Sequence, residues 1–142
     1  MEEPEQASVL PNGRTAAEQI EFRKAEYKKL AGNFKAISDS LKSGAPDMSL
    51  IQAKADDIEA GTKDMGDWFP AGTGPESGLK TSAKAEIWTQ TEDFANKVMA
   101  FQTAAAKLAM AAASGDPESI APAFGATGGT CKSCHDIYKA KG

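Results

Sequence analysis

Side chains suited to a protein core recur at alternating steps of three and four residues in four separate stretches of this 142-residue chain. An α-helix with about 3.6 residues per turn places such side chains on one face. The clearest stretch carries Ile20, Arg23, Tyr27, Leu30, Phe34, Ile37 and Leu41. No stretch shows the strict apolar–polar alternation of a half-buried β-strand. The pattern therefore predicts an all-α fold.

Capping signals mark where the helices are expected to begin. Thr15 with Glu18, and Ser49 with Gln52, have the spacing of a capping box, in which two side chains satisfy free backbone N–H groups at a helix start. We expect helices at roughly residues 15–43, 49–66, 82–113 and 116–140. Amphipathic helices joined by short or moderate loops predict an antiparallel four-helix bundle over residues 15–142.

Composition limits the classes of function that are open to the chain. A content of 41% hydrophobic residues suits one compact domain. Residues 1–14 are polar and contain turn-forming residues, so we expect a flexible N-terminal tail there. The net charge is −4 and no basic stripe is present, so no nucleic-acid partner is expected. The longest strongly apolar run, residues 108–113, is too short to cross a bilayer, so no membrane insertion is expected.

The last expected helix starts well but is intrinsically weak. Asp116 suits an N-cap and Pro117 suits the first helical position. The interior then contains several residues of low helix propensity, namely Pro122, Gly125, Gly128 and Gly129. Small residues let a bulky group approach the backbone closely. We therefore expect this helix to depend for its stability on contacts with groups outside the helix.

The same helix ends in a motif that indicates specific chemistry. Cys131, Cys134 and His135 form the pattern C-x-x-C-H, the signature of haem c attachment. Two thiols one helical turn apart can add to the two vinyl groups along one edge of the porphyrin, and the adjacent imidazole can then coordinate the iron. These are the only two cysteines and the only histidine of the chain. The motif predicts one covalently bound haem c, attached by both cysteines, with His135 as the axial iron ligand.

Three other interpretations of the motif are weaker. A structural zinc site takes four ligands, and only three thiol or imidazole groups exist here. A thioredoxin-like redox pair requires a βαβ setting, which an all-helical chain does not supply. A disulfide across this short loop would add little stability, because the entropic gain grows with loop length.

A C-x-x-C-H motif at the end of a four-helix pattern resembles the cytochrome c′ family, the class II c-type cytochromes. The resemblance extends over roughly residues 17–142 and rests on the segments 21–27, 85–88 and 123–135. It implies a haem-containing bundle. The family divides into low-spin members, which have a Met as sixth iron ligand on the first helix, and high-spin members with five-coordinate iron.

The resemblance assigns the distal side of the haem to the first helix. The position over the open face of the haem matches Tyr27, four residues after the frequent Arg, which is Arg23 here. A Tyr in place of Met resembles the high-spin members, although Tyr oxygen can ligate haem iron in some proteins. Alone, Tyr27 would be interpreted as a core aromatic with a satisfied hydroxyl. Phe34 completes the expected distal pocket.

Other residues are expected to contact the haem from its edges and its proximal side. An inward Arg23 would be costly without anionic partners, and the haem propionates supply them, with Lys24 beside it. Trp68 and Phe124 are candidate pocket walls, or else general core residues. Lys139, four residues after the axial His, is expected to tune the proximal side, or else to be a solvated residue near a helix end.

The expected function is the binding of small diatomic gases, NO and CO, at an iron site gated by Tyr27, for NO carriage or protection against NO. The alternative is one-electron transfer with a redox partner protein. We expect no enzymatic turnover, because the only His is committed to the iron.

Location and assembly follow from the haem chemistry and the resemblance. The start of the chain has neither the basic residues nor the apolar run of a signal peptide. Because c-type haem is normally attached outside the inner membrane, we expect an exported, periplasmic protein whose signal peptide is absent from this sequence. The resemblance also implies a homodimer formed through the first two helices.

Overall fold

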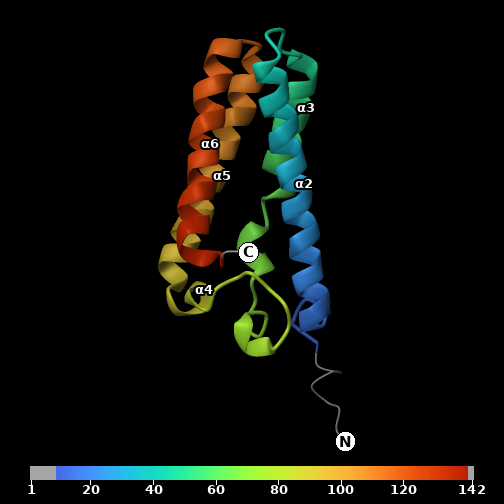
Figure 1. Ribbon diagram of the computed structural model, residues 1–142, viewed down its shortest axis with the longest axis vertical. Helices are drawn as coiled ribbons and strands as arrows, with labels where there is room; N and C mark the ends of the chain where they lie inside the picture. The colour runs from blue at the N-terminus through green and yellow to red at the C-terminus, as the bar shows by residue number, and fades with distance from the viewer. Residues whose placement is uncertain (1–8, 141–142) are drawn as a thin grey trace, which may run out of the picture.

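The computed structural model describes residues 9–140 and consists mainly of helices (Figure 1). The long helices are α2 (Ala16–Lys42), α3 (Met48–Gly61), α5 (Thr91–Ser114) and α6 (Pro117–Tyr138). Between α3 and α5 lie the 3-10 helices η1 (Met65–Trp68) and η2 (Pro75–Ser77) and the short helix α4 (Glu86–Thr89). Within residues 9–140 there is no strand, only an isolated antiparallel bridge between Ala83 and Lys139. The predicted all-α four-helix bundle is confirmed.

The long helices form two hairpins that pack side by side. α2 packs on α3, α3 packs on α5, and α5 packs on α6, whereas α2 and α6 make few direct contacts. The short turns of both hairpins lie at one end of the bundle, and the longer α3–α5 connection lies at the other end (Figure 1). No helix in the described part of the chain is both long and apolar enough to cross a membrane. The segment 1–8 of the expected flexible tail lies outside the described residues, and residues 11–13 form a turn before α2.

The core has the composition expected from the helical stripes. Its fully buried large side chains include Ile20 and Ile37 of α2, Ile51 of α3, Leu108 of α5 and Ile120 of α6. Burying such aliphatic side chains provides about 1.5–3 kcal/mol each relative to exposure. The core therefore joins all four long helices.

The capping residue is predicted correctly for one helix and wrongly for another. The Thr15–Glu18 capping box is present, with both reciprocal hydrogen bonds formed. The expected box at Ser49 is wrong, because the Asp47 carboxylate caps α3 by accepting from the Leu50 N–H. The Ser40 hydroxyl also accepts from the Asp47 N–H at 2.8 Å, which holds the capping residue in place. The capping-box spacing compares only neighbouring residues, so it did not reveal the contribution of Ser40 on the preceding helix.

Two of the expected helices are too long. The range 49–66 ends at Gly61, where the Thr62 hydroxyl donates to the Ile58 carbonyl at 2.7 Å and the backbone leaves the helical region. The range 82–113 is divided into α4 and α5, because Gln90 adopts φ −118° and ψ 55°. Residues 82–84 are not helical either.

The segment 82–84 pairs with the end of α6. The Lys84 N–H donates to the Tyr138 carbonyl at 2.9 Å, and the Ala140 N–H donates to the Ser82 carbonyl at 2.7 Å. Lys139 is consequently extended, so α6 ends at Tyr138 rather than near residue 140. This backbone pairing joins the α3–α5 connection to the C-terminal end of α6.

Candidate haem site

The wide separation of α2 and α6 leaves two adjoining cavities between these helices. Their volumes are about 340 and 240 Å³, and Tyr27, Ala31, Cys134 and His135 line both. The larger volume lies within the range of small-molecule and cofactor sites, roughly 300–1,000 Å³. Closer to the short turns, α2 and α6 do meet, because the rings of Phe34 and Phe124 lie 5.3 Å apart. The gap is therefore closed at one end.

The two cysteines project from α6 toward this gap, one helical turn apart. Both are partly buried, and they do not form a disulfide with each other. Burial, with a further contribution from Cys134, raises the pKa of the Cys131 thiol to about 11. Burial also raises the pKa of the Cys134 thiol. As free thiols, both side chains are therefore neutral near pH 7.

His135 lies next to them and lines both cavities. Partial burial lowers the pKa of its imidazole, and the nearby Lys139 charge acts in the same direction. Both effects favour the neutral imidazole, the form that binds a metal. Within residues 9–140, no three Cys, His, Asp or Glu side chains converge as a metal-ligand set.

Tyr27 lies on α2 and therefore reaches the same cavities from the opposite side. Its ring meets the ring of Trp68 edge-on at 5.3 Å and lies 6.3 Å from that of Phe69. Burial raises the pKa of the Tyr27 hydroxyl, and the neighbouring Cys134 adds to the effect. The hydroxyl has no hydrogen-bond partner among the described residues. Tyr27 is therefore a neutral phenol beside the cavities.

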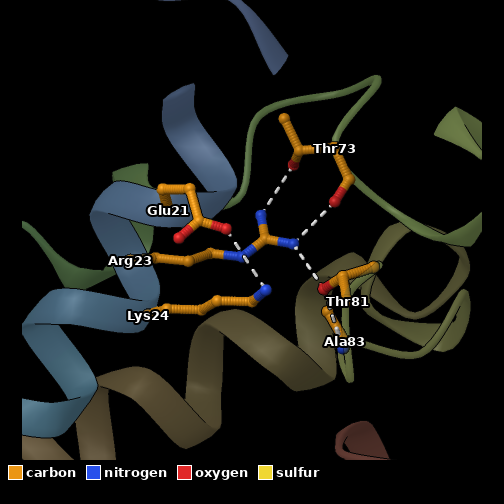
Figure 2. Close-up of polar contacts among 6 residues, drawn as sticks. All are labelled: Glu21, Arg23, Lys24, Thr73, Thr81 and Ala83. Atoms are coloured by element: carbon orange, nitrogen blue, oxygen red, sulfur yellow. Dashed lines mark hydrogen bonds and ion pairs between the residues drawn. The ribbon is translucent and has the colours of Figure 1, made fainter. Parts of the chain in front are cut away.

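Arg23 is the most buried charged side chain near the site, at 3% exposure. Figure 2 shows its guanidinium reaching from α2 to the α3–α5 connection. It donates to the Thr73 hydroxyl at 2.8 Å, to the Thr73 carbonyl at 2.6 Å and to the Thr81 hydroxyl at 3.0 Å. A longer bond of 3.3 Å goes to the Trp68 carbonyl. Protein oxygens thus take up most of its donors.

Among the described residues, Arg23 has no direct ion pair, and its charge is affected by burial and by nearby groups. Burial lowers its pKa, while Tyr27 and Glu76 oppose that shift. The guanidinium carbon lies 4.7 Å from the centre of the Phe69 ring, a cation–π arrangement. Arg23 also lines the larger cavity, so its predicted contact with a haem propionate stays a prediction beside the loop contacts described here.

The structure brings most of the predicted site residues together. The residues that line one or both cavities are Arg23, Lys24, Tyr27, Phe34, Cys131, Cys134, His135 and Lys139. Lys24 is exposed and forms an ion pair with Glu21 at 3.3 Å (Figure 2). Trp68 and Phe124 line neither cavity. They lie behind Tyr27 and Phe34, respectively.

Several lining residues were missed from the sequence. Phe69 and Phe94 line the larger cavity with their rings 5.0 Å apart. Thr81 to Ala83 line it too, but their loop carries no recognisable pattern. Tyr138 lies four residues after Cys134, so both are expected on one face of the last helix, and this spacing was the available signal. Its hydroxyl donates a short hydrogen bond to the Asp93 carboxylate.

The arrangement defines a class of protein. A four-helix bundle with two thiols and an imidazole on the wall of a largely apolar gap fits a haem c and its iron. The family model described as Cytochrome C' matches residues 18–139. The chain is 37% identical to cytochrome c' of Cereibacter sphaeroides over 139 residues, which covers 94% of this chain and 93% of the relative. Identity to cytochrome c' of Allochromatium vinosum is 36% over 137 residues, or 95% and 88% of the two chains.

Solved structures agree with these sequence matches. Cytochrome c' of Thermochromatium tepidum superposes with a TM-score of 0.83 at 34% identity, covering 89% of this chain and 97% of the other. A nitric oxide complex of a variant of cytochrome c prime from Alcaligenes xylosoxidans gives 0.80 at 30% identity, with the same coverage. This chain belongs to the cytochrome c′ family, and its cofactor is covalently bound haem c.

Proposed function

We propose that Cys131 and Cys134 attach the haem, that His135 is the axial ligand, and that the iron binds NO and CO on the side of Tyr27. The observation that carries the proposal is the position of Tyr27 on α2, across the shared cavities from His135 on α6. When bound, the haem would supply the iron atom at which a diatomic gas is held. A second imidazole ligand is excluded, because the chain has one His.

The protein side chains would select ligands by size and polarity. Tyr27, Phe34 and Phe101 make the wall of the smaller cavity largely apolar, which disfavours hydrated ions. Small neutral diatomics can enter when the Tyr27 ring moves aside. Met65 also lines this cavity, and its place in the buried core supports a packing role.

The physiological role that we propose is NO carriage or protection against NO in the periplasm. Support comes from the family and from relatives whose solved structures are nitric oxide complexes, including a ferrous variant from Alcaligenes xylosoxidans. A carrier role suits a site in which no second His can assist the chemistry of O–O bond cleavage.

Absorption spectra of the purified ferric and ferrous protein, with and without CO or NO, test the proposal. We expect a broad high-spin ferrous band that sharpens when CO is added. Sharp low-spin bands that CO does not move would reveal a sixth protein ligand, with Met65 the first residue to replace. That result would contradict gas binding and favour one-electron transfer.

A further inference from the structure

The hydroxyl groups of the two tyrosines beside the larger cavity have different environments. The Tyr138 hydroxyl donates to the Asp93 carboxylate, as an enclosed phenol usually does. The Tyr27 hydroxyl has no hydrogen-bond partner within residues 9–140, although its ring is held by the edge-on contact with Trp68. Tyr27 is only partly buried and lines both cavities, so its hydroxyl is free to donate to a group that enters them.

The side chains in ring contact with Tyr27 are Trp68 and Phe69, and neither offers an acceptor oxygen. The Thr73 and Thr81 oxygens on the α3–α5 connection accept hydrogen bonds from Arg23. Ala31, which lines both cavities together with Tyr27, also has an apolar side chain. A ligand in the space that Tyr27 shares with His135 would offer an acceptor to its hydroxyl.

The protonation state of Tyr27 suits a donor. Because burial raises the pKa of the hydroxyl, the phenol keeps its proton throughout the neutral range. The contribution from Cys134 disappears once that sulfur is a thioether, but the burial remains. A neutral phenol is a poor metal ligand and a good hydrogen-bond donor.

We propose that Tyr27 determines ligand specificity by donating a hydrogen bond from its hydroxyl to the diatomic ligand held at the iron. This inference rests on the proposed function. It goes further than steric gating, because a donor stabilises a ligand whose outer atom carries partial negative charge. The size of the Tyr27 ring then limits the entry of the ligand, and the Tyr27 hydroxyl slows its release.

The CO stretching frequency of the ferrous CO-bound holoprotein tests the inference directly. A hydrogen bond to the outer oxygen draws electron density into the antibonding orbital of CO and lowers this frequency. We expect Tyr27→Phe, which keeps the ring, to shift the band to higher frequency. The CO dissociation rate of this variant should rise roughly two- to tenfold, as expected for the loss of one hydrogen bond.

Tyr27→Leu separates the hydroxyl from the ring. If the hydroxyl is the donor, the bands of both variants lie at the same, higher frequency. If the Phe variant keeps the wild-type band, the inference is overturned while CO binding stands. If the wild-type protein gives no CO band at all, the proposed function fails and this inference fails with it. Circular dichroism of both variants checks that the bundle is intact.

Discussion

The two tyrosines contact the larger cavity from different helices, Tyr27 from α2 and Tyr138 from α6. Tyr138 is 2% exposed, and its hydroxyl is bound to Asp93, whereas Tyr27 is less enclosed and its hydroxyl contacts no acceptor in the described part of the chain. Residue type alone would have assigned both to the core. The two residues differ in the hydrogen-bond partners that other helices provide. Spacing along the sequence does not reveal such partners.

Tyr138 should make stability depend on pH in the alkaline range. Burial first, and the bond to Asp93 second, raise its pKa to about 12. The folded protein therefore keeps a proton that the unfolded chain releases near pH 10, and the resulting stabilisation is lost as pH rises toward 12. We expect the free energy of unfolding of the wild type to fall more steeply across this interval than that of Tyr138→Phe.

Urea unfolding followed by circular dichroism at several pH values measures this slope. At neutral pH, Tyr138→Phe should cost about 1 kcal/mol through the lost hydrogen bond. Parallel curves for the two proteins between pH 10 and pH 12 would contradict the assignment.

Among the elements, the connection between α3 and α5 depends most on distant partners. Arg23 holds it from α2 at Thr73 and Thr81, and the end of α6 holds it at residues 82–84. These contacts join positions about fifty residues apart in sequence. Residues 81–83 of the connection thereby form part of the cavity wall although they lie outside its short helices.

Arg23→Met should loosen this connection. The substitution leaves the Thr73 carbonyl and two hydroxyl groups without their donor, so we expect a loss of about 2–4 kcal/mol in the free energy of unfolding. Hydrogen exchange should accelerate at the backbone amides of residues 73–84. A matched control is Lys35→Met, which removes only an exposed ion pair with Asp39 and should change stability by less than about 0.5 kcal/mol. Equal effects of the two variants would argue against an anchoring role for Arg23.

The start of α3 offers a second test at the level of an element. Asp47→Ala removes the observed cap and should destabilise the protein by about 0.5–2 kcal/mol. Ser49→Ala, at the position that sequence spacing favoured, should have little effect. Thermal unfolding of the two variants compares them, and a larger loss for Ser49→Ala would show that the cap has been wrongly assigned.

The limits of sequence interpretation follow from these elements. The helical stripes and the Thr15–Glu18 box are local, so the long helices were predictable from neighbouring residues. The same is true of the spacing of Cys131, Cys134 and His135, although their roles stay proposals. The division at Gln90, the partners of Arg23 and the contribution of Phe69 depend on tertiary contacts, and no local pattern encodes them.

For the molecule as a whole, the gap between α2 and α6 is the dominant feature. α5 connects the two hairpins through the core, but α2 and α6 meet closely only near Phe34 and Phe124. α6 also contains Pro122 and several glycines, and Gly128 faces the smaller cavity. A group filling the gap would therefore supply contacts that this helix lacks.

Removal of both attachment sulfurs tests this dependence. We expect Cys131→Ala combined with Cys134→Ala to lose the haem and much of the helical circular dichroism. Ser133→Ala, which keeps both thiols, serves as the control and should retain the haem. A double variant that keeps full helicity and a cooperative thermal transition without haem would show that the bundle does not need its cofactor.

Self-association should be weak if it uses α2 and α3. The large apolar side chains exposed within residues 9–140 are Val9, Leu79, Met99 and Met110, none of them on these two helices. A homodimer through α2 and α3, as the resemblance implies, would therefore bury mainly polar side chains, with partly exposed apolar ones such as Phe22 and Leu50. We expect sedimentation velocity to show an equilibrium that shifts to monomers at high salt. A dimer that persists at low micromolar concentration and high salt would contradict this expectation.

The aromatic rings that enclose the site also give the protein an internal optical reporter. The ring of Trp68 contacts that of Tyr27, and the ring centres of Trp88 and Phe69 lie 6.4 Å apart. Both tryptophans of the chain therefore lie next to residues that line the cavities. A haem in the gap would absorb at the wavelengths where indole emits and would quench both by energy transfer. Tryptophan fluorescence should therefore be nearly dark in the loaded protein and bright when the haem is lost. Cofactor occupancy could then be followed during assembly and unfolding without an attached label.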